Sequence, residues 1–380
     1  MQDNFSYWEQ KSFLSGYDIM IIGSGIVGLN AALHLKTKQP ALKIGILEAG
    51  FIPGGASTKN AGFACFGSVS ETLDELETSS EDEVMKVVEM RWRGLQKMKT
   101  LLGEKAIDLQ QFGGYEIFRG DDQEISDSCI EKLDYLNRLF QEITGLTAIY
   151  AVANEKIAGF GFSNVSAMIS NYAEAQIDTG RMMQALITKA QSLGVSLFNN
   201  CKLLTLEKSS EQQLLITSQG NFKAKKVIMA TNAFIGSFYP ELNVIPGRGQ
   251  VLVTAPIDNL SIKGTFHYDK GYYYFRNVDN RILLGGGRNI DFKAEETLEA
   301  GVTQVVQNKL EELLYNTILP GKKPKIEYRW SGVMAFGDQL KPIIKQVEQN
   351  IYCAVRCNGM GVALGSLSGE QVADLVLKDL

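Results

Sequence analysis

The first clear pattern along the chain is a run of apolar positions without alternation, residues 17–22, which glycines connect to a helical pattern over residues 29–37. A second run of the same kind covers residues 43–48. Short segments in which neighbouring positions are nearly all apolar are typical of parallel strands buried on both faces. These three segments therefore predict one β-α-β unit near the start of the chain.

Beyond this unit, helical and strand patterns alternate. Apolar spacing predicts helices over residues 70–103, 130–143 and 181–193. It predicts a strand pair at 195–197 and 203–206, further strands at 214–217 and 226–230, and a strand-rich aromatic region at 249–287. The chain closes with a strand at 351–355, a glycine-rich turn, and a helix from about residue 361. This order predicts an α/β protein with two interleaved domains, which is also the default for 380 residues.

Composition and charge argue against several classes of protein. A net charge of −5, with basic residues scattered, gives no reason to expect a nucleic-acid partner. The longest apolar run is broken by glycines, so we expect no transmembrane segment, and the N-terminus lacks the pattern of a secretory signal. Five cysteines without a Cys-x-x-Cys spacing, and only two histidines, argue against structural disulfides and a metal site. We expect a cytoplasmic protein.

The turn after the first strand carries the clearest chemistry. Gly23, Gly25 and Gly28 form a Gly-x-Gly-x-x-Gly motif between a strand and a helix, the context in which such a motif binds a dinucleotide. The glycines allow a tight turn, close approach of a pyrophosphate and close helix packing, and the helix N-terminus faces the phosphates. Glu48 ends the next strand, where a carboxylate binds ribose hydroxyls. The alternative is a glycine turn without a ligand. The motif also places Ser24, Ile26, Val27 and Ala49 beside the cofactor.

FAD and NAD share this motif, so a second loop has to decide between them. Small residues follow the ribose carboxylate directly, and they let a loop lie flat on a pyrophosphate or a flavin ring. The predicted contacts in this loop are Gly55, Ala56, Ser57, Asn60, Ala61 and Gly62. The alternative is an ordinary surface loop.

At this point the sequence resembles the D-amino-acid oxidase superfamily of FAD-dependent oxidoreductases, which includes glycine oxidase, sarcosine oxidase and gamma-glutamylputrescine oxidoreductase. The matching stretches occur in family order along nearly the whole chain. They are residues 17–28, 47–50, 55–62, Ile177-Asp178, 230–233, 330–332, Asp338 with Pro342, and 359–362.

The resemblance implies a Rossmann-like FAD-binding domain interleaved with an α+β substrate domain built on an antiparallel sheet. The FAD-binding domain would comprise residues 16–75, 160–235 and 330–380, and the substrate domain residues 76–159 and 236–329. Backbone near Leu203 would touch adenine, and the last helix would direct its N-terminus at the pyrimidine edge of the flavin. The further cofactor contacts implied are Ala230, Thr231, Asn232, Gly332, Gly359, Met360, Gly361 and Val362.

The chain departs from the family at its substrate and attachment residues. Met334 stands where glycine oxidase and D-amino-acid oxidase have a carboxylate-binding arginine, and apolar Val362-Ala363 stands where sarcosine oxidase has a lysine. The cysteine that attaches flavin in sarcosine oxidase has no counterpart, so we expect FAD to be held non-covalently.

Other residues are candidates for the substrate or for tuning the flavin. Arg276 or Arg356 could bind a carboxylate with two hydrogen bonds, and a structural salt bridge is the alternative for each. Tyr274 belongs to a tyrosine cluster that either contacts an amine or packs in the core. Lys59, beside the flavin loop, could stabilise reduced flavin or anions derived from oxygen. We expect His267 to be structural or a polar group of the pocket, and Cys65 and Cys357 to be packing residues.

The predicted function is FAD-dependent oxidation of the C–N bond of an amino acid or amine, by hydride transfer to flavin and hydrolysis of the imine. The acceptor that reoxidises the flavin, oxygen or another molecule, is left open. The alternatives are an FAD-dependent dehydrogenase of a hydroxy compound and a non-catalytic dinucleotide-binding sensor.

Overall fold

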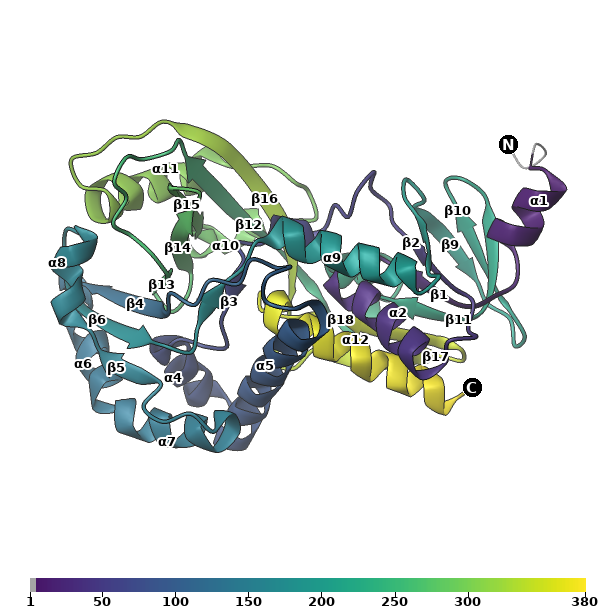
Figure 1. The fold of residues 1–380 in the computed structure, drawn as a ribbon, viewed down its shortest axis with the longest axis horizontal. Helices are drawn as coiled ribbons and strands as arrows, with labels where there is room; N and C mark the ends of the chain where they lie inside the picture. Colours follow the sequence, from purple (N-terminus) through teal and green to yellow (C-terminus); the bar gives the residue numbers. More distant parts are fainter. Residues whose placement is uncertain (1–4) are drawn as a thin grey trace.

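The computed structural model describes residues 5–380 and contains two eight-stranded sheets, which lie towards opposite ends of the long axis in Figure 1. The first sheet has the order β17-β18-β11-β1-β2-β8, with β10 and β9 continuing from β11. Its strands are β1 (Tyr17–Ile22), β2 (Ile44–Leu47), β8 (Ser196–Phe198), β9 (Leu203–Glu207), β10 (Gln213–Thr217), β11 (Asn221–Met229), β17 (Ile343–Glu348) and β18 (Ile351–Val355).

The centre of this sheet is parallel: β1 pairs with β2 and β11, β2 with β8, and β11 with β18, and both faces of this part are covered. Ile19, Met20 and Ile21 are fully buried, as the unbroken apolar run predicts. The helices that pack against this sheet and one another are α2 (Ile26–Lys38), α5 (Glu81–Leu102), α9 (Thr179–Ser192) and α12 (Gly361–Lys378). The predicted β-α-β unit and the closing strand–turn–helix are therefore confirmed.

The second sheet has the order β16-β12-β15-β14-β13-β4-β6-β5 and is antiparallel except for the pairing of β13 with β4. Its strands are β4 (Gly114–Arg119), β5 (Tyr150–Val152), β6 (Val165–Asn171), β12 (Ile245–Thr254), β13 (Thr265–Tyr268), β14 (Tyr273–Val278), β15 (Arg281–Gly286) and β16 (Ile326–Phe336). The neighbouring helices are α4 (Val69–Thr78), α6 (Gln123–Glu131), α7 (Leu133–Thr144), α10 (Phe292–Glu295) and α11 (Gln304–Leu313).

Short elements complete the described chain. Those that matter for the site are α3 (Ala56–Lys59), β3 (Phe63–Ala64), β7 (Ala175–Gln176), η4 (Asn232–Ser237) and η6 (Arg288–Ile290). The others are α1 (Tyr7–Glu9), η1 (Gln10–Leu14), η2 (Gly120–Asp122), η3 (Asn154–Lys156), α8 (Ile157–Phe160), η5 (Pro240–Leu242) and η7 (Leu314–Ile318). Of the helices described here, none is long and apolar enough to cross a membrane.

The structure differs from the sequence-based elements in several places. The helical pattern over 70–103 is two helices, because Ser80 forms a capping box that starts α5 anew. The expected pair of strands 195–197 and 203–206 is wrong: β8 pairs with β2, and β9 pairs with β10. Strands β4, β5 and β6 were not predicted at all. The domain boundaries remain a prediction, but β6 and most of β16, placed in the FAD-binding ranges, are strands of the second sheet.

Candidate cofactor and substrate cavity

The glycine turn after β1 is packed so closely that larger side chains would collide with backbone. Gly23 has φ +104° and its N–H donates to the Leu47 carbonyl at 2.8 Å. A Cβ on Gly23 would lie 2.7 Å from the carbonyl oxygen of Ala230, and one on Gly28 would lie 2.0 Å from that of Gly23. These approaches hold the ends of β1 and β11 against the start of α2.

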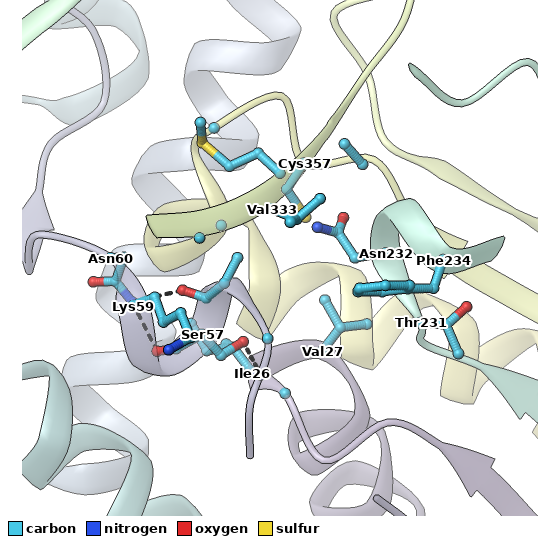
Figure 2. Close-up of a pocket in the computed structure, with 18 of the residues that line it drawn as sticks. Ile26, Val27, Ser57, Lys59, Asn60, Thr231, Asn232, Phe234, Val333 and Cys357 are labelled. Atoms are coloured by element: carbon cyan, nitrogen blue, oxygen red, sulfur yellow. Dashed lines mark hydrogen bonds between the residues drawn. The ribbon is translucent and has the colours of Figure 1, made fainter. Parts of the chain in front are cut away.

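The N-terminus of α2 opens into a cavity with a polar neighbour beside it. Gly25 is the N-cap and supplies no side chain, so the first N–H, that of Ile26, donates instead to Ser57 Oγ at 3.0 Å. The N–H of Val27 belongs to the same first turn and has no intrahelical acceptor. Figure 2 shows Ile26 and Val27 at this end of the helix, with Ser57 alongside. The arrangement suits an anionic group such as a pyrophosphate.

Glu48 connects the end of β2 to the glycine turn. One carboxylate oxygen accepts from the N–H and the hydroxyl of Ser24, at 3.1 and 2.6 Å, and the other accepts from the N–H of Gly50 at 2.9 Å. The side chain is buried but lines the cavity. Because two carboxylate oxygens offer about four acceptor sites, Glu48 retains capacity for ribose hydroxyls.

The loop that carries α3 is held in shape by its own side chains. Asn60 Oδ1 accepts from the N–H of Gly62 at 2.9 Å and from the Thr179 hydroxyl at 2.8 Å. Trp330 Nε1 donates to the Lys59 carbonyl at 2.9 Å, which attaches the loop to β16. Within the described residues, the Lys59 ammonium has no ion-pair partner, and the side chain lines the cavity. Asn60 therefore shapes the loop, whereas Lys59 is available to a ligand.

The N-terminus of α12 faces the same cavity from the opposite side. Gly359, with φ +82°, turns the chain into the helix, and Met360 provides no side-chain cap for the following N–H groups. Thr231 Oγ1 is buried with no hydrogen-bond partner among residues 5–380, and Thr231 also lines this space. Figure 2 shows Asn232 and Phe234 of η4 across the cavity from Ser57 and Lys59. Two open helix ends and an unpartnered hydroxyl are the groups that a polar dinucleotide would satisfy.

One cavity of about 1270 Å³ connects these elements with the second sheet. Apart from Ser24 and Gly28, every residue predicted to contact the cofactor lines it, including the backbone position Leu203 and the loop residues Ala49, Ala56 and Ala61. Ser24 instead bonds Glu48, and Gly28 packs under the turn. The residues present therefore fit an extended dinucleotide such as FAD.

The end of the cavity on the second sheet, where we predict the substrate, is aromatic. Tyr272 and Tyr274 face it, whereas Tyr273 points into the core between them, as alternation along β14 requires. A Cβ on Gly285 would lie 2.5 Å from the ring of Tyr274, so this glycine makes room for the tyrosine. Burial raises the pKa of Tyr274 to about 12. Phe63 meets the Tyr274 ring edge-on at 5.6 Å, and Met334 also lines the space.

The two arginines predicted to bind substrate are not part of the lining. Arg276 shares the face of Tyr274 but lies under the loop at Gly62, whose carbonyl accepts a long hydrogen bond of 3.5 Å from it. Burial lowers the pKa of Arg276 to about 10. Arg356 has φ +65° and turns away from the cavity, donating to the Lys341 carbonyl at 2.9 Å beside Gly337. Loop packing and backbone conformation, neither visible in the sequence, decide both cases.

Arg288 lines the cavity and was not singled out from the sequence, nor were Lys202, Lys208 and Lys270. Arg288 follows Gly286 and Gly287, whose φ angles are +110° and +77°, at the end of β15. A Cβ on Gly286 would lie 1.9 Å from the Tyr272 carbonyl oxygen. A glycine run after an apolar strand is the same signal that marks the first turn, and it could have identified this position.

His267 is a polar group of the pocket with a fixed partner. Its Nε2 lies 3.0 Å from Glu174 Oε2, and both side chains are buried. Burial alone would lower the pKa of His267, but the Glu174 carboxylate, with Glu71 and Glu116, raises it to about 9. Cys65 places its sulfur within 4.8 Å of these ligand-type atoms. The ion pair satisfies the imidazole and carboxylate, and burial raises the pKa of the Cys65 thiol well above its usual range.

Comparison with known proteins places these features in a wider context. The family described as FAD dependent oxidoreductase matches residues 18–375. A gamma-glutamylputrescine oxidoreductase of Escherichia coli (strain K12) is 25% identical over 379 residues, covering 95% of this chain and 84% of that protein. A glycine oxidase of Bacillus licheniformis is 22% identical, covering 95% and 93%. The solved glycine oxidase of Geobacillus kaustophilus has a TM-score of 0.76 at 20% identity, covering 95% of each chain.

Proposed function

The chain belongs to the FAD-dependent oxidoreductase family, and from that premise we propose that it oxidises the C–N bond of a small amine or amino acid. The observation that carries the proposal is one continuous cavity. It runs from the glycine turn predicted to bind phosphate, past the N-terminus of α12, to an aromatic chamber on the second sheet. The relatives named above act on amines or amino acids by their printed names, which supports the same substrate class.

When bound, FAD supplies the acceptor for the hydride that leaves the carbon next to nitrogen. Gly359, Met360, Gly361 and Val362 form the start of α12, and this helix N-terminus would favour the negative charge of reduced flavin. Tyr274 and Phe63 wall the chamber and exclude water from the reacting carbon. The lone pair of a neutral amine assists the departure of the hydride, so no protein base is needed, and the imine product hydrolyses in water.

Lys59 remains our candidate for stabilising the charge of reduced flavin or of an anion derived from oxygen, because it lines the cavity on the flavin loop without an ion-pair partner among the described residues. Whether oxygen or another acceptor takes the electrons is part of the test below. All five cysteines are free and buried, in keeping with the cytoplasmic location that we propose.

Anaerobic titration of the FAD-loaded protein with panels of amines, amino acids and alcohols tests the function. Loss of the oxidised-flavin absorbance with an amine, and formation of the matching carbonyl compound, would support the proposal. Reduction by alcohols alone would indicate a dehydrogenase of hydroxy compounds. A flavin that stays oxidised with every compound would point to a dinucleotide-binding sensor. Readmission of oxygen to the reduced protein then reports the acceptor.

A further inference from the structure

Arg288 presents an unpaired guanidinium to the substrate end of the cavity. No acceptor oxygen of residues 5–380 lies within hydrogen-bonding or ion-pair distance of it; its one electrostatic neighbour is the Tyr272 phenol. Arg288 is partly buried, and this burial lowers the pKa of its guanidinium. A guanidinium carries five N–H donors in a planar fork. None of the Arg288 nitrogens is fully buried, so water can satisfy them in the free protein, and an anion entering the cavity would replace that water.

Aromatic rings orient this guanidinium without using its donors. Its Cζ lies 3.9 Å from the ring centroid of Phe336, 5.0 Å from that of Phe292 and 5.8 Å from that of Tyr272. Contacts with ring faces fix the guanidinium plane while the N–H edge stays free. The side chain is therefore already oriented for a planar anion that accepts two hydrogen bonds, as a carboxylate does.

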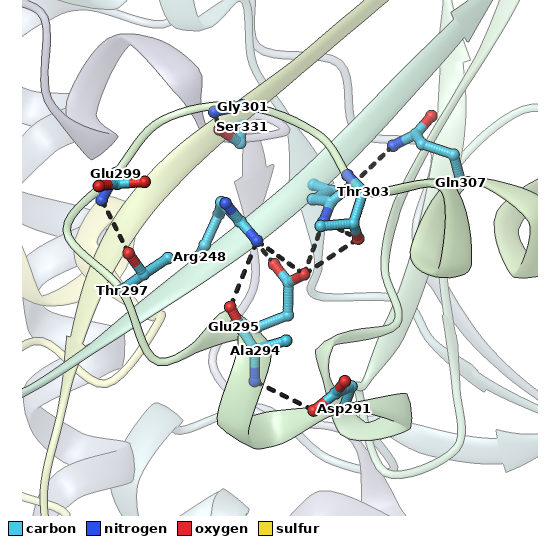
Figure 3. Close-up of polar contacts among 11 residues, drawn as sticks. Arg248, Asp291, Ala294, Glu295, Thr297, Glu299, Gly301, Thr303, Gln307 and Ser331 are labelled. Atoms are coloured by element: carbon cyan, nitrogen blue, oxygen red, sulfur yellow. Dashed lines mark hydrogen bonds and ion pairs between the residues drawn. The ribbon is translucent and has the colours of Figure 1, made fainter.

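The segment that carries Arg288 is anchored to the second sheet by a buried ion pair. Arg248 on β12 donates to both carboxylate oxygens of Glu295, at 2.8 and 3.0 Å. Figure 3 shows Glu295 between Arg248 and Thr303, whose hydroxyl donates to it at 3.1 Å, and Gly301 beside Ser331. These contacts fix the end of α10 and the chain that follows it, and on the Arg288 side of α10 Asn289 Nδ2 donates to Asp269 at 2.9 Å.

The other cations near this end of the cavity already have acidic partners. Lys270 is paired with Asp74 at 2.5 Å and His267 with Glu174 at 3.0 Å. Lys59 and Lys202, which have no ion-pair partner among the described residues, belong to the flavin loop and to the neighbourhood of Leu203 at the predicted adenine end. Among the described residues that line the cavity, Arg288 is thus the cation beside the second sheet that has no acidic partner.

We propose that Arg288 is the residue that binds substrate through a carboxylate, so that the preferred substrate is a carboxylate-bearing amine. That the bound carboxylate belongs to the substrate rests on the proposed function, but the existence of the anion site does not. A bidentate charge-assisted pair in a partly buried site changes affinity by roughly ten- to hundredfold.

Calorimetric titration of the FAD-loaded protein with benzoate, and with benzamide as its neutral isostere, tests the site without turnover. We expect benzoate to bind the wild type at least about tenfold more tightly than benzamide. Arg288→Met should lose that preference, and Arg288→Lys, which keeps the charge but not the fork, should retain part of it. Lys293→Met, which removes an exposed cation five residues away, is the matched control and should behave as the wild type.

Flavin content and circular dichroism of each variant show whether it has folded. If Arg288→Met has not folded, the benzoate preference of Arg288→Lys is the deciding measurement. Equal benzoate affinity in wild type and the folded Arg288 variants, or no preference for benzoate in the wild type, would overturn the inference. The two proposals fail separately. Arg288-dependent benzoate binding in a protein whose flavin no amine reduces keeps the anion site and ends the proposed function. If the protein oxidises amines but its benzoate affinity does not depend on Arg288, the proposed function stands and the anion site at Arg288 is refuted.

Discussion

Replacing Gly28 by alanine tests whether close packing of the first turn is what holds the cofactor site open. The added methyl carbon would lie 2.0 Å from the Gly23 carbonyl oxygen and 3.2 Å from Ile21 Cγ2. Because the nearer contact is with backbone, relief requires α2 to move by roughly 1 Å, and overpacking of this kind costs about 1–3 kcal/mol. Alanine would otherwise favour a helix over glycine by up to about 1 kcal/mol. The clash exceeds that gain, and movement of α2 also displaces the N–H groups predicted to face the pyrophosphate.

We therefore expect Gly28→Ala to weaken FAD binding by roughly tenfold or more and to lower stability by about 1–2 kcal/mol. The assays are titration of the apoprotein with FAD, followed by flavin fluorescence, and urea unfolding. Gly159→Ala in α8 is the control: a methyl there has no atom within 4 Å, so FAD affinity should not change and stability should rise by at most about 1 kcal/mol. If Gly28→Ala bound FAD like the wild type, the turn would not depend on close packing.

Three further predictions concern residues around the same cavity. Gly25→Val should yield colourless protein, because its Cβ would lie 2.8 Å from Ser57 Oγ and its branches would enter the predicted pyrophosphate position; a normal flavin-to-protein absorbance ratio would contradict this. Glu174→Gln should cost roughly 1–3 kcal/mol at pH 6 in urea unfolding. The raised pKa of His267, about 9, makes the ion pair contribute fully below pH 6.5 and lose its effect as pH rises through 9, so an equal cost at pH 10 would refute the assignment. Arg276→Met and Arg356→Met should leave benzoate affinity unchanged, since neither side chain lines the cavity; a tenfold loss in either would restore the sequence-based choice.

The dinucleotide site could be predicted from sequence because its chemistry is local. Gly28 is required by contact with the backbone of Gly23, five residues earlier, and Gly23 by its own φ of +104°; Glu48 follows at the end of the adjacent strand. A strand, a turn and a helix are enough to specify that geometry. The same reasoning identified the second glycine turn, at Gly359, because it too follows a buried strand and opens a helix.

The substrate residues could not be predicted in this way, because distant segments decide which side chains face the cavity. Alternation along β14 places Arg276 on the face that carries Tyr274, but the loop at Gly62 covers the arginine. Arg288 has no such alternation, since it lies beyond the end of β15, and Phe336 of β16 positions it. The strands β4, β5 and β6 escaped prediction for a similar reason. Their pairing joins segments around residues 115 and 170, and long-range pairing leaves a weaker pattern in sequence than helical periodicity does.

One hydrogen bond between the loop that carries α3 and the second sheet bears on both proposals. Trp330 of β16 donates to the Lys59 carbonyl, and a Cβ on Gly332 would lie 3.1 Å from the Cβ of Lys59. The flavin loop of the first sheet is thereby fixed against the strand that continues to Met334 and Phe336, and Phe336 in turn packs on Arg288. The predicted flavin position and the proposed anion site are thus tied through one strand, β16. Strand β16 would then fix the distance between the flavin and the carboxylate of an amine substrate. Loss of the Trp330 hydrogen bond should therefore impair the orientation of the substrate even where FAD and the carboxylate each still bind.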